Sequence, residues 1–115
     1  MLSEIDAIAM TYFHTCTIKR KIYVTDEFGA EEPEIIIIAD NVKCAVSKNS
    51  LPNLVEGGLQ TYSTTHKLYT YPEIDIKAGD FIIANVEGDL MKFQASRPFK
   101  YPTHLEVPIL YKEVI

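Results

Sequence analysis

The sequence lacks several features that mark membrane and secreted proteins: it has no tryptophan, only two cysteines and no long apolar run. No stretch reaches the ~18 apolar residues of a transmembrane helix. No signal-peptide pattern is present at the start of the chain. We therefore expect no membrane partner, and a protein that is soluble and intracellular when it is made.

Cysteine and histidine are too scattered to indicate a metal site. Cys16 and Cys44 form no C-x-x-C pair and fall in different expected strands. Two reduced core thiols are the favoured interpretation, and a disulfide between them stays open. His14, His66 and His104 do not complete a set with the paired spacing of a zinc site. We expect no metal and no cofactor.

Positive charge is scarce, because 11 Lys and Arg stand against 16 Asp and Glu, for a formal net charge of −5. A domain that grips nucleic acid needs clustered cations to bind the phosphates. The one dense basic run, Lys19-Arg20-Lys21, interrupts an alternating pattern and is typical of a solvated strand face. An acidic balance is still compatible with DNA that passes the protein without adhering to it.

Catalytic signatures are also missing. The sequence contains neither a nucleophile elbow nor a glycine-rich phosphate loop, and Gly57-Gly58 alone is a weak signal. Asp75 and Asp80 flank an expected turn, where carboxylates commonly bond the backbone. A half-buried histidine that bonds the backbone is the simplest interpretation of His104. We expect that this protein is not an enzyme.

The sequence is rich in β-forming residues instead. Its 115 residues suffice for one core, so we expect a single domain over residues 1–115. Pro72–Ser96 predicts a central meander, with strands at Ile74–Ile76, Phe81–Ala84 and Leu90–Ala95. Turns that contain glycine separate the three strands.

A long hairpin is expected before this meander. Thr15–Val24 alternates between apolar and polar residues, and Glu34–Val46 contains four consecutive isoleucines, which favour a strand. The acidic stretch between these two segments predicts their turn. Asp40-Asn41 predicts a bend in the second strand.

Two further strands complete the expected fold. They are Thr61–Tyr71 and His104–Tyr111, and Pro108 places the last strand at an edge or facing a gap. The whole pattern predicts an all-β protein: a small β-barrel of meander plus long hairpin, with a short N-terminal helix at residues 1–13.

The predicted helix and one strand supply candidates for an interface. Apolar residues of the helix recur at helical spacing, and a helix this short must dock on the sheet or on another subunit. Arg20 breaks the apolar side of its strand, so that face is expected to be wet or interfacial. The interface candidates are Leu2, Ile5, Ile8, Tyr12 and Arg20.

Ser47–Gln60 is the irregular part of the sequence. Pro52 and Gly57-Gly58 interrupt regular structure there, although several residues are apolar. A loop of this length in a small domain is often functional. A disordered crossover and one helical turn packed on the barrel fit the same pattern.

Several stretches together resemble the head-tail connector proteins of tailed bacteriophages and prophages of Gram-positive bacteria. They are Asn41–Ser47 before the long segment, His66–Tyr69, Ile74–Asp80 and Phe93–Val107. Within that group the chain looks most like the head-closure, or stopper, proteins. The N-terminal helix departs from a bare barrel, and would dock an adaptor or mark a neighbouring connector family.

The resemblance implies a β-barrel that assembles as a homo-oligomeric ring, generally of twelve subunits, between portal or adaptor and tail proteins. It implies bacterial cytoplasm during assembly and the virion neck thereafter. A long loop would close the channel on the packaged DNA, with Gly57 and Gly58 as hinges. By position this channel loop comprises Ser47, Lys48, Asn49, Ser50, Leu51, Pro52, Asn53, Leu54, Val55, Glu56, Gly57 and Gly58.

Two alternative functions stay open. One is another joining part, a tail-terminator or tail-completion protein, which shares the small β architecture. The other is a small β-barrel ligand-binding module or enzyme in which Tyr62, Tyr69 and Tyr71 line a groove.

Overall fold

The structure, a computed structural model, describes residues 4, 8, 10–54 and 60–114. One antiparallel sheet is formed from strands in the order β3-β2-β1-β4-β5-β7-β6, and an additional pairing of β3 with β7 closes it into a ring. The predicted all-β barrel is therefore confirmed. The strands are β1 (His14–Thr25), β2 (Glu31–Leu54), β3 (Gln60–Thr70), β4 (Phe81–Val86), β5 (Asp89–Ala95), β6 (Phe99–Lys100) and β7 (Leu105–Val114).

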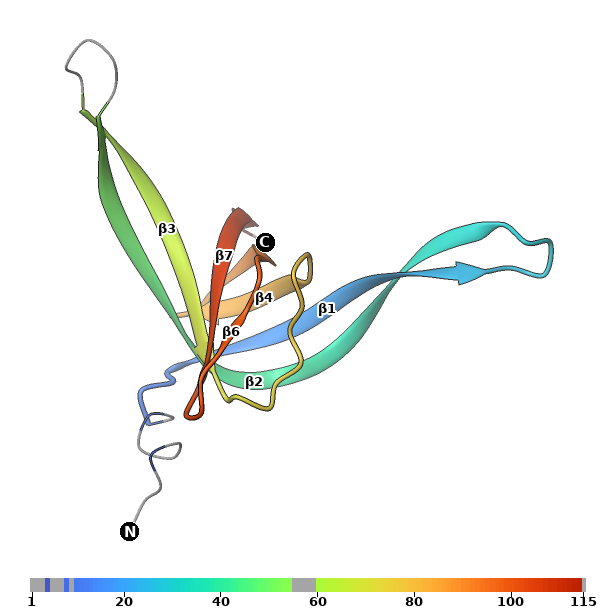
Figure 1. Cartoon of the computed structure of the whole chain (residues 1–115), viewed down its shortest axis with the longest axis horizontal. Coiled ribbons are helices and arrows are strands. Elements are labelled where there is room, and N and C mark those ends of the chain that lie inside the picture. Colours follow the sequence, from blue (N-terminus) through green and yellow to red (C-terminus); the bar gives the residue numbers. More distant parts are fainter. Residues whose placement is uncertain (1–3, 5–7, 9, 55–59, 115) are drawn as a thin grey trace.

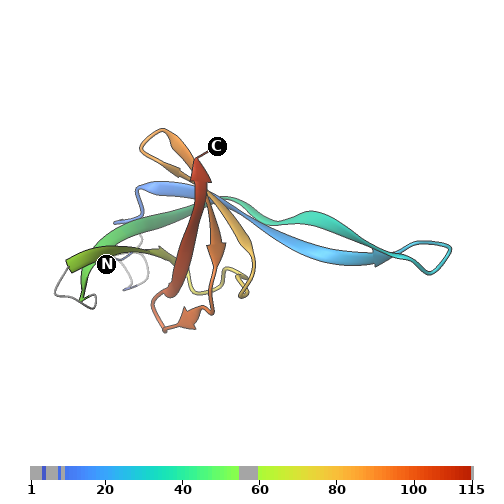
Figure 2. The same ribbon diagram turned by 90° about the horizontal axis from the view of Figure 1, so that it is seen from above.

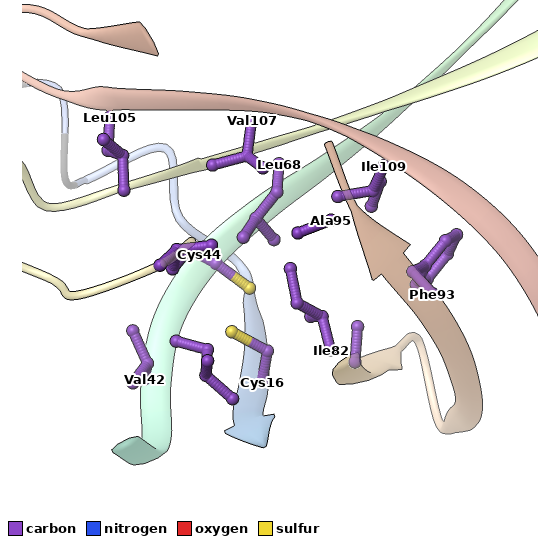
Figure 3. Packing of buried hydrophobic residues seen from close by; sticks show 13 residues of the cluster. Cys16, Val42, Cys44, Leu68, Ile82, Phe93, Ala95, Leu105, Val107 and Ile109 are labelled. Atoms are coloured by element: carbon purple, nitrogen blue, oxygen red, sulfur yellow. The ribbon is translucent and has the colours of Figure 1, made fainter. Parts of the chain in front are cut away.

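The core lies inside this ring and follows the period of two expected for strands (Figure 3). Leu68, Ile82, Phe93 and Val107 are fully buried, and they come from four different strands. The buried hydroxyl of Thr70 donates to the Lys43 carbonyl at 2.8 Å, so it carries no unpaired polar group into the core.

The predicted meander is correct for two of its three strands. β4 and β5 pair through a tight turn, in which Glu87 and Gly88 have φ of 53° and 95°. Ile74–Ile76 is not a strand, because the chain crosses from β3 to β4 through turns. Its alternation reflects two side chains, because Ile76 packs into the core and the half-buried Ile74 packs against it. The Asp80 carboxylate accepts from the Lys77 amide at 2.9 Å and holds this turn.

Pro108 lies inside the sheet, and β7 is not an edge strand. On one side β7 pairs with β6 over Leu105 and Glu106 and with β5 from Ile109 onward. Pro108 falls between these two paired stretches, where its carbonyl accepts from the Ser96 amide at 2.9 Å. The missing N–H therefore falls at a gap between two ladders, and the prediction of an edge strand is wrong.

Two hairpins project from the barrel as arms (Figures 1 and 2). β1 pairs with β4 only over Thr15–Lys19 and continues with β2 alone, so we call residues 20–36 the first arm. β3 pairs with β7 only over His66–Thr70, so we call residues 49–54 and 60–65 the second arm. The radius of gyration is 17.0 Å, against about 13 Å for a compact chain of this length.

The second arm corrects the prediction of a long loop. Ser47–Leu54 belongs to β2 and pairs with β3, with Pro52 opposite Tyr62, so the loop prediction is wrong for these residues. Each strand of a lone hairpin has an unpaired edge, where proline is tolerated. Val55, Glu56, Gly57 and Gly58 lie outside the described residues.

The predicted N-terminal helix falls largely outside the described residues and stays a prediction there. It is wrong at its end, because Met10 and Thr11 form a turn and the backbone of Tyr12 and Phe13 is irregular. The Thr11 amide donates to the Ile8 carbonyl at 3.0 Å.

Candidate assembly surface

The outer face of the first arm continues onto the barrel as a row of apolar and lysine side chains. Ile37, Lys19 and Phe81 lie side by side on β2, β1 and β4, because each pairs with the next. Ile35 and Ile37 are 52% and 59% exposed, which is high for isoleucine. We call this surface the outer patch; it comprises Lys19, Lys21, Ile35, Ile37, Phe81, Ile83 and Lys92.

The outer patch is hollowed beside the barrel. A cavity of about 340 Å³ is lined by Lys19, Ile35, Phe81, Ile83, Lys92 and Glu113. The Lys92 ammonium lies 4.8 Å from the centre of the Phe81 ring, a cation–π contact. Lys92 therefore covers part of the apolar surface at Phe81 and brings a positive charge to the hollow.

The tip of the first arm has the opposite character. Asp26 accepts from the amides of Phe28 and Ala30 at 2.9 and 2.8 Å, and Gly29 has φ of 83°, which together hold a tight turn. Phe28 at its end is 87% exposed. We call the exposed residues around this turn the acidic tip; they are Glu27, Phe28, Glu31 and Glu32.

Charge is strongly separated along the sequence. Residues 22–42 contain six Asp and Glu and no Lys or Arg. All other residues together contain ten acids and eleven cations, so they are close to neutral. The net negative charge of the protein therefore lies on the first arm and its root.

Arg20 joins the first arm to the barrel. Its guanidinium donates to both oxygens of Asp80, at 2.9 and 2.8 Å, and to Asp75 at 3.3 Å. The Asp80 side chain is only 3% exposed and Asp75 is 58% exposed. The hydrogen bond to Asp80, followed by that to Asp75, raises the pKa of Arg20 further above its ordinary value. The interface candidate Arg20 thus has partners in its own chain, and a role between subunits stays a prediction.

A bulge sets the direction in which the first arm leaves the barrel. The β1–β2 register shifts between Cys16 and Ile18, opposite the predicted bend. Asn41 has φ of 51°, a left-handed conformation that asparagine tolerates. The Asp40 carboxylate accepts from the Thr17 hydroxyl at 2.6 Å and the Asn41 amide at 2.9 Å, and these bonds lower the pKa of Asp40. The predicted bend is confirmed.

The remaining interface candidates are placed only in part. Leu2 and Ile5 lie outside the described residues. Tyr12 is buried in its own chain, where its hydroxyl donates to the Thr70 carbonyl at 3.1 Å and its ring meets Tyr71 edge-on at 5.5 Å. Burial is the first cause that raises the pKa of Tyr12.

The proposed tyrosine groove does not correspond to the hollows beside the barrel. Tyr69 packs near His104 and Tyr71 packs on Tyr12. Two hollows beside the barrel, of about 500 and 480 Å³, are lined by neither Tyr69 nor Tyr71. The side chain of Tyr62 lies outside what the structure describes.

Besides Arg20 and its two carboxylates, polar side chains gather where the Lys67 ammonium donates to Glu106 at 2.9 Å and His104 lies 3.7 Å from the same carboxylate. No group of three or more His, Cys, Asp or Glu in the described part of the chain could hold a metal. Cys16 and Cys44 are free and buried with their sulfurs facing one another (Figure 3), and the pKa of the Cys44 thiol is raised by its hydrogen bond with Cys16 and by burial. Among the described residues, no helix has the length and apolar character that a bilayer crossing requires.

Comparison with known proteins supports the fold. No family model matches the chain, and no curated protein matches it. Among solved structures, the phage-like element PBSX protein xkdH of Bacillus subtilis is similar, with a TM-score of 0.53 over 86% of this chain and 93% of that one. The two are 20% identical, so the likeness establishes a shared fold.

Sequence reasoning missed most of the outer patch and assigned Asp80 to turn chemistry alone. The available signal for Asp80 was Arg20, a cation in an apolar strand face that needs a carboxylate partner. The exposure of Ile35 and Ile37 had no comparable signal, because a run of isoleucines reads equally well as a buried strand.

Proposed function

We propose that this protein is a structural component of a tailed phage or prophage, a head-tail connector of the stopper type. In this role it forms a ring below the portal or adaptor, joins head to tail and closes the DNA channel. The observation that carries the proposal is the fold shared with a phage-like element protein along nearly the whole of both chains.

The shape of the molecule supports an assembly role. A protein that functions as a monomer rarely exposes a contiguous apolar patch. This chain exposes Phe28, Ile35 and Ile37 on a projecting arm. Arms that exceed the barrel on two sides provide contact area between subunits of a ring (Figure 1). A formal net charge of −5 fits a conduit that DNA passes more than a DNA anchor.

The second arm is the candidate for the channel. β2 and β3 stay paired as far as Leu54 and Gln60. In the proposed ring the segment that connects these two residues, with Gly57 and Gly58, enters the channel and blocks the DNA, and passing DNA contacts it only transiently.

The test is electron microscopy of particles from a phage or prophage whose copy of this gene is deleted. The expected result is heads that have lost DNA beside free tails of normal length, with the wild-type gene restoring complete particles. As a matched comparison, the deletion is complemented with a variant gene in which residues 49–65 are replaced by a two-residue turn. Its particles should join heads to tails but retain DNA poorly. Filled heads with tails of abnormal length would assign a tail-terminator role instead, and fully infectious particles would refute the proposal.

A further inference from the structure

The outer patch and the acidic tip are complementary surfaces on one chain. The patch offers apolar side chains rimmed by Lys19, Lys21 and Lys92, with the hollow beside Phe81 at its centre. The tip offers Phe28, 87% exposed, among carboxylates without a cation. Aromatic anchors that enter a pocket inside a charged rim are the usual centres of protein interfaces.

We propose that the acidic tip of one protomer docks in the outer patch of a second copy, with Phe28 in the hollow beside Phe81. This inference rests on the proposed ring and names its subunit contact. Tip and patch are different surfaces, so the contact between subunits is heterologous. Heterologous contacts form a ring when the rotation between subunits closes.

The charges favour this occupant although the patch is not purely basic. Glu113 lines the hollow and Asp40 lies at its far margin beside Thr17. Three lysines still exceed these two carboxylates, whereas Glu27, Glu31 and Glu32 at the tip have no local cation. The tip points away from its own barrel (Figure 2), so it does not reach the patch of its own chain.

Photo-crosslinking locates the contact. A benzophenone amino acid replaces Phe28, and a matched variant carries it at Leu110, which is also exposed, at 59%, but lies on β7. In purified protein, and in particles complemented with the variant, position 28 should crosslink to peptides that contain Lys19, Phe81 or Lys92 of another copy. Position 110 should not. Crosslinks from position 28 to any other surface overturn the inference.

Charge exchange then tests the complementarity. One variant reverses the patch (Lys19→Glu, Lys21→Glu, Lys92→Glu) and another reverses the tip (Glu27→Lys, Glu31→Lys, Glu32→Lys). Each alone should self-associate at least about tenfold more weakly than wild type in sedimentation velocity. Mixed together they should recover association, because each tip then meets a patch of opposite charge. Reversal of Lys43, Lys77 and Lys100, exposed elsewhere, should have little effect.

The outcomes separate this inference from the proposed function. The tip-to-patch contact is overturned, and the proposed ring is kept, if both charge-reversed variants associate as strongly as wild type. The same holds if a mixture of the two variants stays dissociated. Wild-type protein that is monomeric at every concentration, without intermolecular crosslinks in particles, overturns both the contact and the homo-oligomeric ring. If gene deletion abolishes infectivity although the purified protein is monomeric, the connector role is kept and self-assembly is rejected.

Discussion

At the scale of single residues, the contact between Arg20 and Asp80 ties the first arm to the barrel. A bidentate guanidinium–carboxylate pair is geometrically specific, and here the carboxylate is almost fully buried. The sequence shows that Arg20 is out of place in its strand. It does not show the partner, which lies 60 residues away and is brought near only by the pairing of β1 with β4.

Asp80→Asn should lower the free energy of unfolding by about 3 kcal/mol, because it leaves the Arg20 charge half-buried and facing a neutral amide. The measurement is urea unfolding followed by circular dichroism. Asp75→Asn is the matched control, since Asp75 is 58% exposed, and should cost less than about 1 kcal/mol. Equal effects of the two substitutions would show that the buried Arg20–Asp80 pair is not what stabilises the junction between the first arm and the barrel.

His66 should make stability depend on pH. Burial, and then the charge of Lys48, lower its pKa in the folded state below the ordinary value of about 6.5. Above that value both states are neutral; below it the unfolded state binds a proton that the folded state resists, so stability falls as the pH falls. Wild type should therefore lose more stability than His66→Gln between pH 7.5 and 5.5, as measured by urea midpoints. The same loss in both proteins would contradict the assignment.

At the scale of elements, alternation predicted the strands well wherever a strand has one buried face. β1, β3, β4, β5 and β7 follow it closely, because their inward side chains form the core. The pattern failed at Ile74–Ile76, where backbone bonds to Asp80 hold turns. It also failed at Ser47–Leu54, because a two-stranded arm outside the barrel needs no buried face and leaves no alternation to find.

The bulge at Asn41 provides a prediction at this scale. Asn41→Val should destabilise the protein by about 1–2 kcal/mol, because a β-branched residue is strained at positive φ. Asn41→Gly should be close to neutral, since glycine adopts this conformation freely. Thermal unfolding of both variants checks the difference. A valine variant as stable as the glycine variant would mean that the bulge can shift its register at no cost.

At the scale of the whole molecule, the open shape follows from unequal strand lengths. β2 has 24 residues and β1 has 12, whereas β4 has only 6, so the longer strands extend beyond their neighbours. The lengths of β1 and β3 could be estimated from the sequence, but that of β2 could not, because the sequence predicts a loop where β2 continues over Ser47–Leu54. Which strand flanks which could not, and that pairing decides how much of a hairpin is left outside the barrel.

Removal of the first arm should leave the barrel intact. Residues 22–34 replaced by Asn-Gly, which joins the paired residues Lys21 and Ile35, should give a protein with unchanged core packing, because no residue of that segment belongs to the buried cluster. Its melting temperature should stay within a few degrees of wild type, and its radius of gyration in small-angle X-ray scattering should fall. A truncated protein that fails to unfold cooperatively would show that the arm is part of the folding unit.

Both arms share a single strand. β2 runs from the first arm, through the barrel wall, into the second arm, so the covalent path between them is already extended and has almost no slack. A force applied at one arm is therefore transmitted along the backbone of β2 to the other arm. The bulge at Asn41 is the place where this strand can extend. If the protein forms the proposed ring, force from packaged DNA on the second arm would pass through the first arm to the neighbouring subunit. Crosslinking the first arms should accordingly slow hydrogen exchange in the second, and unchanged exchange would count against this mechanical link.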